Sequence, residues 1–343
     1  MPGYRIEPYV VDFLVTPSRR VPRVRTSPNL WDHLGTCRAR LGLDRNHYTV
    51  NPGLYAIGAP DSQSAVVVTA NYKLTFDTVR FTLAGRNIWL LVADTRGINV
   101  WCAGGKGTFS AQAITDQIRQ CGLERVVTHR RLILPQLGAN GVRVSDIRRA
   151  TGFTAEFGPV RAEDLPRFLD HGPDETMRAV TFSLRERAEV IPVELVLGWK
   201  LILCAFVVAG LLSLMGSPLA AAAILERWFL ACAATVLGLV GGAVLFPLFL
   251  PWLPTRIFSV GGAGIGLILS TGLAFFFPNL SWPTVLGAAL WTAAMSSWLA
   301  LNFTGSTPYT SPSGVEKEMR LAIPTLAGST VAGILLFVIG NFL

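Results

Sequence analysis

Short apolar runs alternate with segments of helical periodicity in the first half of the chain. The apolar runs predict buried strands, at 65–70, 88–93, 126–128, 132–134 and 153–157. The helical patterns lie between and around these runs, at 31–41, 75–83, 110–121, 145–150 and 161–169. Alternation at this spacing predicts an α/β domain with a largely parallel sheet, a Rossmann-like arrangement.

The second half of the chain is apolar almost throughout. Five segments are each long enough to cross a bilayer as helices, and they cover about 198–216, 228–250, 257–277, 282–302 and 321–342. Tryptophans lie toward the ends of several segments, where aromatic side chains meet the lipid headgroups. We therefore expect an all-α membrane domain of five transmembrane helices.

These patterns divide the chain into four parts. Residues 61–172 form the predicted α/β domain, and residues 198–343 form the predicted membrane domain. Residues 1–60 are rich in proline, arginine and glycine, and we expect an extended, irregular region that packs on the soluble domain. Residues 173–197 are polar and are predicted to be a linker, with one candidate strand at 179–184.

The distribution of charge supports this division. Of the 30 lysines and arginines and the 22 aspartates and glutamates, only five and three lie beyond residue 197. The predicted inner flanks of the spans carry six basic residues and the outer flanks only Arg227, which places the first domain in the cytoplasm by the positive-inside rule. The N-terminus lacks the apolar core of a signal peptide. Five spans place the C-terminus outside, in a multi-pass protein of the cytoplasmic membrane.

Composition also argues against two classes of function, nucleic-acid binding and transport. The net charge of +8 is not gathered in a long basic run and no nucleic-acid motif is present, so we expect membrane lipid and no nucleic acid as a partner. The predicted spans carry almost no ionisable residues near their centres, whereas transporters and ion pumps need them. Their many glycines indicate close helix packing. An anchor or docking platform is therefore favoured over a transporter.

The main candidate for chemistry is Cys102, within the stretch NVWCAGGKG at residues 99–107. It lies between the strand at 88–93 and the helix at 110–121, whose N-terminus would favour a thiolate, the form that binds metals. The glycines allow a backbone or a flat ligand to come close. A lone cysteine is more often a small core residue. None of the five cysteines has the spacing of a disulfide framework, a zinc site or an iron–sulfur cluster.

Three segments directly follow predicted strands, and these are Thr69–Tyr72, Asn99–Lys106 and Pro135–Asn140. Ligands of α/β sheets bind beyond the carboxyl ends of the strands, so we expect the three segments to converge on one ligand. A phosphate loop at 104–108 is weakly supported, because the first glycine of that motif is missing. Elsewhere, Cys121 is expected to be a core thiol and His129 a surface residue.

The stretch over residues 99–106 matches, at every position, the signature N-[VI]-W-C-A-[AG]-G-K of the mercury-methylating corrinoid protein family, HgcA. The layout of a soluble α/β domain followed by five spans also resembles that family. The soluble domain is similar to the corrinoid domain of the large subunit of the corrinoid iron–sulfur protein. This chain has neither the cluster cysteines nor the soluble C-terminal half of that relative.

The resemblance implies a cobalamin bound with its own base displaced, and Cys102, on a cap helix, as the lower axial ligand of its cobalt. The rest of the motif would shape the surface that faces the corrin ring, and the other two segments would hold the edge and tail of the cofactor. The implied cofactor-binding residues are Thr69, Asn71, Asn99, Val100, Trp101, Cys102, Ala103, Gly104, Gly105, Lys106, Gly107, Pro135, Gln136, Leu137, Gly138 and Asn140.

The resemblance further implies a corrinoid-dependent methyltransferase of anaerobic one-carbon metabolism. Methyl-Co(III) would pass its methyl group to Hg(II) and give methylmercury, because a thiolate trans to the methyl group donates charge and weakens the cobalt–carbon bond. The methyl donor would be methyltetrahydrofolate or a corrinoid methyltransferase, and a ferredoxin-type partner with two [4Fe-4S] clusters would re-reduce cobalt. Two alternatives stay open: a membrane-anchored corrinoid methyl carrier for a metalloid or a one-carbon pathway, and a non-enzymatic membrane receptor or carrier with a soluble sensory domain.

Overall fold

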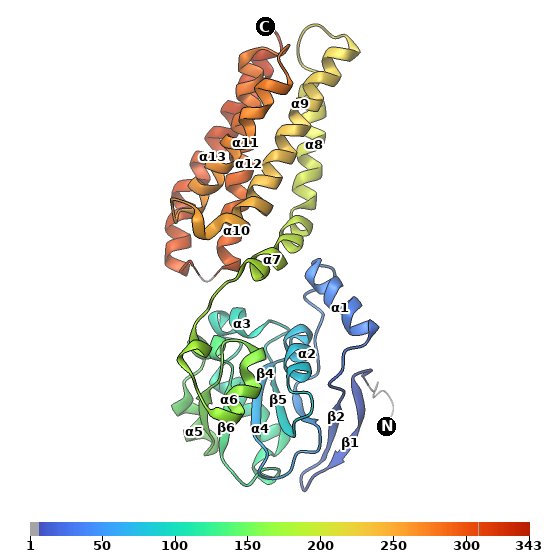
Figure 1. Ribbon diagram of the computed structural model, residues 1–343, viewed down its shortest axis with the longest axis vertical. Coiled ribbons are helices and arrows are strands. Elements are labelled where there is room, and N and C mark those ends of the chain that lie inside the picture. Colours follow the sequence, from blue (N-terminus) through green and yellow to red (C-terminus); the bar gives the residue numbers. More distant parts are fainter. Residues whose placement is uncertain (1–6, 308) are drawn as a thin grey trace. The chain divides into compact units, whose positions relative to one another are not determined.

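The computed structural model describes residues 7–307 and 309–343. The chain forms two compact units, which divide between Val180 and Thr181. The first unit combines a sheet with helices, and the second consists of helices (Figure 1). The predicted order, an α/β domain followed by a helical region with several apolar helices, is therefore confirmed.

One sheet of seven strands, in the order β1-β2-β3-β5-β4-β6-β7, forms the centre of the described part of the α/β unit. The strands are β1 (Val10–Val15), β2 (Arg20–Val24), β3 (Gly53–Ile57), β4 (Val66–Ala70), β5 (Ile88–Ala93), β6 (Arg131–Leu134) and β7 (Thr154–Phe157). The neighbours β5, β4, β6 and β7 are parallel, whereas β3 runs antiparallel to β5 and β1 antiparallel to β2. The expected parallel core is present, within a sheet that is mixed as a whole.

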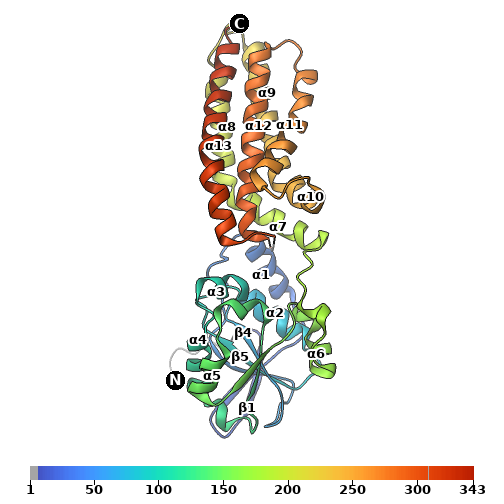
Figure 2. The ribbon, with the colours of Figure 1, turned by 90° about the vertical axis from the view of Figure 1, so that its left-hand side faces the viewer.

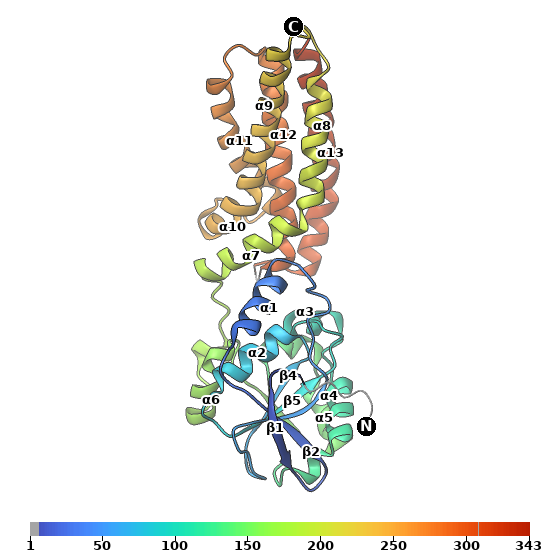
Figure 3. The same ribbon diagram turned by 90° about the vertical axis from the view of Figure 1, so that its right-hand side faces the viewer.

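Helices cover both faces of this sheet (Figures 2 and 3). They are α1 (Leu30–Arg40), α2 (Lys73–Thr82), α3 (Val100–Lys106), α4 (Ala111–Cys121), α5 (Val144–Thr151) and α6 (Leu165–His171), with 3₁₀ turns η1 (Leu123–Arg125), η2 (Gln136–Gly141), η3 (Ala162–Asp164) and η4 (Glu175–Arg178). Helices α4 and α5 bury Ile118 and Ile147 on one face, and α2 and α6 bury Phe76 and Phe168 on the other. Side chains of β4 alternate between these two cores, as a strand requires.

Residues 7–60 contain more regular secondary structure than predicted. They contain β1, β2, α1 and β3, which extend the sheet at one edge and add a helix beside α2. Proline and arginine obscure the strand pattern, because β2 carries Pro22 between two arginines. Helix α1 begins with a capping box, in which Asn29 Oδ1 accepts from the Asp32 N–H at 2.8 Å. The strand expected at 126–128 is not formed.

The second unit packs its helices closely. They are α7 (Leu184–Leu197), α8 (Trp199–Ser213), α9 (Ala221–Leu239), α10 (Phe246–Phe249), α11 (Phe258–Phe276), α12 (Trp282–Asn302) and α13 (Pro312–Gly340), with a π-helical segment (Val240–Leu245) and 3₁₀ turns at Leu250–Trp252 and Phe303–Ser306. Helix α12 contacts α9, α11 and α13. A Cβ added to Gly262 would lie 2.5 Å from Ala300 Cβ, so the glycines serve close packing as expected.

The predicted spans differ in their bounds from the observed helices. Among the described residues, four helices are long and apolar enough to cross a membrane, and they cover Ala221–Trp252, Phe258–Phe276, Trp282–Gly305 and Ser313–Gly340. Helix α8 alone has 15 residues, about 22 Å, which is short of the roughly 30 Å of a bilayer core. A fifth span requires Leu184–Val196 and Trp199–Ser213 together, at a bend of 56°.

The boundary between the two units falls inside the predicted linker 173–197, and the second part of that segment forms the helix α7. The candidate strand at 179–184 is not formed. Ser183 and Glu186 begin α7 as a capping box, and this polar start hid the helix in the sequence pattern. Arg227 lies inside α9 and not on a flank, because that helix begins at Ala221.

Candidate functional site

The motif residues form a short helix of their own, α3, and not the junction with the helix 110–121 that the pattern suggested. Asn99 precedes α3, and its side-chain Oδ1 accepts a hydrogen bond from the backbone N–H of Cys102 at 2.9 Å. Gly107, with φ of 73°, ends the helix in the left-handed region, where glycine is favoured. The local support of Cys102 is therefore the cap of α3, since α4 begins only at Ala111.

Burial divides the motif into two faces of α3. Val100, Ala103 and Gly104 are buried and join the core beneath. The opposite face is exposed, and it consists of Trp101, Cys102, Gly105 and Lys106. A Cβ added to Gly105 would have nothing within 4 Å, so the surface beside the thiol is open and flat.

The buried face of α3 rests on η2, the segment that follows β6. A Cβ added to Gly104 would lie 3.4 Å from Gly138 Cα, and one added to Gly138 would lie 2.6 Å from the Phe109 ring. At Gly141 it would lie 2.4 Å from the Phe109 carbonyl oxygen. The segments 99–106 and 135–140 therefore converge, as expected, but Gly104 and Gly138 serve the contact between them and do not line an open surface.

Asn71, at the end of β4, holds the connection between β5 and α3. Its Oδ1 accepts from the Thr95 N–H (3.0 Å), the Thr95 hydroxyl (2.8 Å) and the Gly97 N–H (2.9 Å), and its Nδ2 donates to Asp94 (3.1 Å). The amide oxygen of Asn71 is thus used within the protein. Asn71 links the end of β4 to the connection that leads into α3, and none of these bonds reaches the segment 135–140.

Thr69 lies on the other face of the sheet from α3. Side chains alternate along β4, so Thr69 shares the face of Val67, which packs with α2, whereas Val100 of α3 belongs to the opposite core. Thr69 is fully buried, and its hydroxyl has no hydrogen-bond partner among the described residues. The Thr69 side chain therefore points away from the face that carries α3, which does not support the expected contact of Thr69 with the same ligand as Cys102.

Cys121 and His129 were expected to be a core thiol and a surface residue, without a role in the chemistry. Cys121 is buried, Gln117 donates to its Sγ at 3.3 Å, and burial raises the pKa of the thiol. The imidazole Nε2 of His129 lies 3.0 Å from the Ser64 carbonyl oxygen. No group of three or more His, Cys, Asp or Glu within the described ranges could hold a metal ion.

A buried ionic cluster went unrecognised in the sequence. Arg80 of α2 donates to Asp77 at 2.7 Å and to Asp32 of α1 at 2.8 Å, and Lys73 lies 2.6 Å from Asp77. Burial alone would raise the pKa of Asp32, but the Asn29 backbone N–H, Arg80 and Lys73 hold it below its usual value. The available clue is the spacing of Lys73, Asp77 and Arg80, which puts them on one side of α2.

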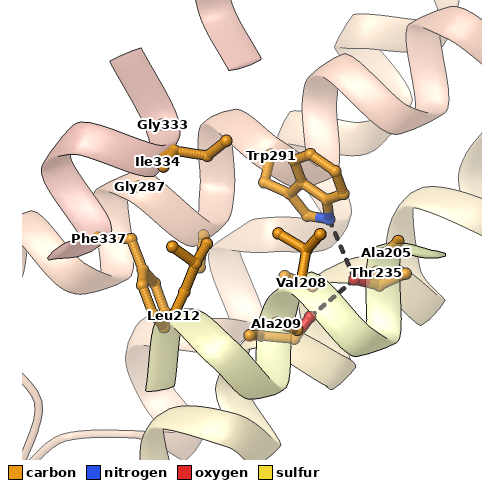
Figure 4. A pocket seen from close by; sticks show the side chains of 13 residues that line it. Ala205, Val208, Ala209, Leu212, Thr235, Gly287, Trp291, Gly333, Ile334 and Phe337 are labelled. Carbon is orange, nitrogen blue, oxygen red and sulfur yellow. Dashed lines mark hydrogen bonds between the residues drawn. The ribbon is translucent and has the colours of Figure 1, made fainter. Parts of the chain in front are cut away.

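The helical unit contains pockets of a different character. One, shown in Figure 4, is apolar, measures about 40 Å³ and lies among α8, α9, α12 and α13. Trp291 Nε1 donates to the Thr235 hydroxyl at 3.0 Å along its wall. A larger one of about 680 Å³ lies beside α11, α12 and α13 and includes Lys317 and Glu318. Neither pocket involves residues predicted to carry chemistry.

Comparison with known proteins relates the α/β unit to one family. Residues 38–169 match the model of the CO dehydrogenase/acetyl-CoA synthase delta subunit family, CdhD. This range runs from α1 to α6 and includes α3 and η2. The match covers less than half of the chain and lies within the first unit.

Curated relatives are gamma subunits of a complex of similar name. The gamma subunit of the acetyl-CoA decarbonylase/synthase complex of Methanopyrus kandleri is 38% identical over 128 residues, or 37% of this chain and 27% of the relative. The gamma subunit of Methanocaldococcus jannaschii is 36% identical over 138 residues, 39% of this chain and 28% of the relative. That of Methanothermobacter thermautotrophicus is 32% identical over 148 residues, 41% and 31%. The chain spans between about a quarter and a third of the length of these relatives.

Proposed function

We propose that this chain is a corrinoid methyl carrier whose α/β unit holds the cofactor against α3, with the Cys102 thiolate as lower axial ligand of cobalt. The proposal starts from the relationship of residues 38–169 to subunits of acetyl-CoA synthase complexes. The observation that carries it is the exposed face of α3, where one thiol stands beside an open glycine.

The residues present fit a large flat cofactor. Gly105 leaves the surface beside Cys102 free of any Cβ, and Trp101 adds a half-exposed aromatic ring to the same face. The position also fits, because α3 and η2 follow β5 and β6 at the carboxyl edge of a parallel sheet, where α/β proteins bind ligands. The order of the strands reverses at β4, because β5 lies on one side of it and the next strand, β6, lies on the other. Such a switch point between parallel strands is where α/β sheets form a binding crevice.

When bound, the corrinoid would supply a cobalt atom that accepts a methyl group and releases it to a soft acceptor, with electrons returned by a ferredoxin-type partner. The protein's part is to hold a charged sulfur in place. Asn99 fixes the backbone at Cys102, and the buried face of α3 anchors it on η2. A thiolate donates more charge than a neutral imidazole and would promote release of the methyl group with its electrons.

We further propose Hg(II) as the acceptor, with methylmercury as the product. The support is the agreement of residues 99–106 with the signature of the mercury-methylating family. The same resemblance supports a membrane location, with the α/β unit in the cytoplasm and the apolar helices of the second unit crossing the cytoplasmic membrane. The alternative is a methyl carrier for a metalloid or a one-carbon intermediate, favoured by the names of the curated relatives.

The first experiment is to load the purified full chain with cobalamin and record its absorption and electron paramagnetic resonance spectra. We expect a base-off corrinoid with a sulfur ligand in the wild type, and loss of the sulfur signature in Cys102→Ala. Cys37→Ala and Cys204→Ala are matched controls, because both cysteines are also exposed. An unchanged spectrum in Cys102→Ala would overturn the axial-ligand assignment.

The acceptor needs a second measurement. Cells that carry this chain together with a two-cluster ferredoxin should form methylmercury from added Hg(II), and Cys102→Ala should abolish this. A corrinoid-loaded chain that transfers no methyl group to Hg(II), but does transfer it to another acceptor, would establish the alternative.

A further inference from the structure

Helix α1 carries its polar and apolar side chains in the reverse of the usual arrangement. Its buried side includes Asp32, which is 6% exposed and engaged with Arg80 and Lys73 of α2. Its outer side presents Leu30, Trp31 and Leu34, and Trp31 is 73% exposed. A helix at the surface of a soluble protein normally turns its apolar side inward.

The outward apolar side is continuous along the helix and beyond its end. Positions 30, 31, 34, 37 and 41 fall on one side at the helical spacing, and all of them are exposed. Leu43 is exposed in the turn that follows. Exposed apolar residues that gather in this way mark a contact surface, whereas single ones need no explanation.

We propose that this side of α1 docks on the surface of an anionic lipid bilayer. The inference rests on the membrane crossing proposed above and not on the corrinoid.

Three features favour lipid as the occupant, and the first is charge. Arg38 is exposed within the apolar side, between Trp31 and Leu34 on the helical projection, whereas Asp32 is buried and neutralised by its partners. Along α1 itself this side therefore presents a cation and no exposed carboxylate to an anionic surface, whereas Asp44 is exposed in the turn beyond the helix.

The second feature is the kind of side chain. Tryptophan and leucine beside arginine are typical of helices that lie in the headgroup region, where the indole ring and the guanidinium group both find favourable partners. The third feature is the short connection. Only residues 181–198 separate the α/β unit from the apolar helix α8, so the α/β unit is tethered by a short segment to a bilayer that the second unit would cross.

The test uses the full chain and its own cysteines. Cys37 lies on the proposed docking side and Cys102 on α3, and both are exposed. The chain is placed in nanodiscs that contain phosphatidylglycerol, in nanodiscs of phosphatidylcholine, and in amphipol without a bilayer. Each sample is labelled with a membrane-impermeant maleimide, and the rate at each cysteine is read by peptide mass spectrometry.

We expect Cys37 to react about ten-fold more slowly in phosphatidylglycerol nanodiscs than in amphipol, because two large apolar side chains favour docking, while Cys102 keeps its rate. Trp31→Glu and Leu34→Glu should restore the Cys37 rate, and Val15→Glu, a change at an exposed position of β1, should not. Phosphatidylcholine should protect less, since the Arg38 attraction is lost.

Three results would overturn the proposal. Cys37 rates that are equal in phosphatidylglycerol and amphipol, and as fast as that of the exposed Cys102, would show that nothing covers the helix. Cys37 rates that are equal in all three environments, and much slower than that of Cys102, would show that the chain itself covers it. Protection that survives Trp31→Glu would show that the apolar side is not the contact. A chain that fails to enter nanodiscs would instead contradict the membrane crossing, whereas the cobalamin spectra are independent of both.

Discussion

Asn99 and Cys102 are joined by one hydrogen bond, from the backbone N–H of the cysteine to the side-chain Oδ1 of the asparagine, at 2.9 Å. The bond satisfies an N–H that the helix itself cannot satisfy, because it lies in the first turn. It also fixes the backbone of the residue that carries the candidate ligand. The start of α3 and the position of the thiol are therefore set by the same side chain.

Asn99→Ala should weaken corrinoid binding without removing the thiol. Loss of an N-cap costs about 1 kcal/mol, and α3 has only seven residues with which to compensate. We expect an affinity about five-fold lower in a cobalamin titration followed by absorbance. Asn99→Asp keeps a capping oxygen and serves as the control. Wild-type affinity in Asn99→Ala would show that the cap does not position Cys102.

Substitutions at Gly105 and Gly141 should separate binding from folding. Gly105→Ala meets open space and replaces a poor helix former, so thermal stability should be maintained or rise by up to about 1 kcal/mol while cobalamin affinity falls. Gly141→Ala would place a Cβ 2.4 Å from the Phe109 carbonyl oxygen, so stability itself should fall. Thermal melting and cobalamin titration of both variants provide the comparison. Unimpaired binding in Gly105→Ala would contradict the flat docking surface.

Substitutions of Asn71 and Thr69 should have opposite effects on the free energy of unfolding. Asn71→Ala leaves the Thr95 and Gly97 N–H groups without their acceptor, at about 1–3 kcal/mol for each buried group. Thr69→Val removes a buried hydroxyl that has no partner in the described structure, so stability should be unchanged or higher. Chemical denaturation measures both effects. A fall in cobalamin affinity in Thr69→Val would instead assign that hydroxyl to the cofactor.

Arg80→Met should destabilise the α/β unit by about 1.5–3 kcal/mol near pH 7, because the buried Asp32 and Asp77 each lose a charged hydrogen-bond donor and keep Lys73 as the cation that they share. The pKa of Asp32 is lowered in the folded protein, so its contribution is present above the usual carboxyl pKa of about 3.9 and is lost as pH falls through the lower folded value. Wild-type stability should therefore decline below about pH 4.

The matched control is Arg86→Met, which removes an exposed ion pair with Asp170 and should cost at most about 1 kcal/mol. The first thermal unfolding transition of the full chain, measured between pH 2.5 and 7, gives the loss of stability in each variant and the pH dependence of the wild type. Equal losses in the two variants would contradict the special role of the buried cluster.

The parallel core was predictable because its strands are continuous apolar runs with helical patterns between them. Strands β4 and β5 are buried at every position, which is the strongest form of that pattern. Strands β1 and β2 alternate or carry arginine and proline, so composition alone suggested irregular chain. Their place in the sheet depends on pairing with residues far along the sequence, which periodicity does not show.

The segments that form the candidate site were predictable from the sequence. Which of their residues are exposed and which pack against the rest of the protein was not. Cys102 is exposed on α3, and its chemistry stays a prediction, whereas Gly104 and Gly138 looked like cofactor-facing residues and are packing residues. A glycine that admits a ligand and one that admits another backbone are identical in sequence. The role of Asn71 could not be predicted either, because only the structure of the segment between β5 and α3 reveals that Thr95 and Gly97 donate to its oxygen.

The bonds made by Asn71 have a consequence for the strength of ligand binding. One end of this network is β4, whose register with β5 is fixed through Ala70 and Ala93, and the other end is the connection that leads to Asn99. The thiol is thereby placed by the sheet before any ligand arrives. Under the proposed ligation, a donor that is already in place avoids the entropy cost of ordering a loop when the ligand binds, so the single sulfur of Cys102 would contribute most of its bond energy to the affinity.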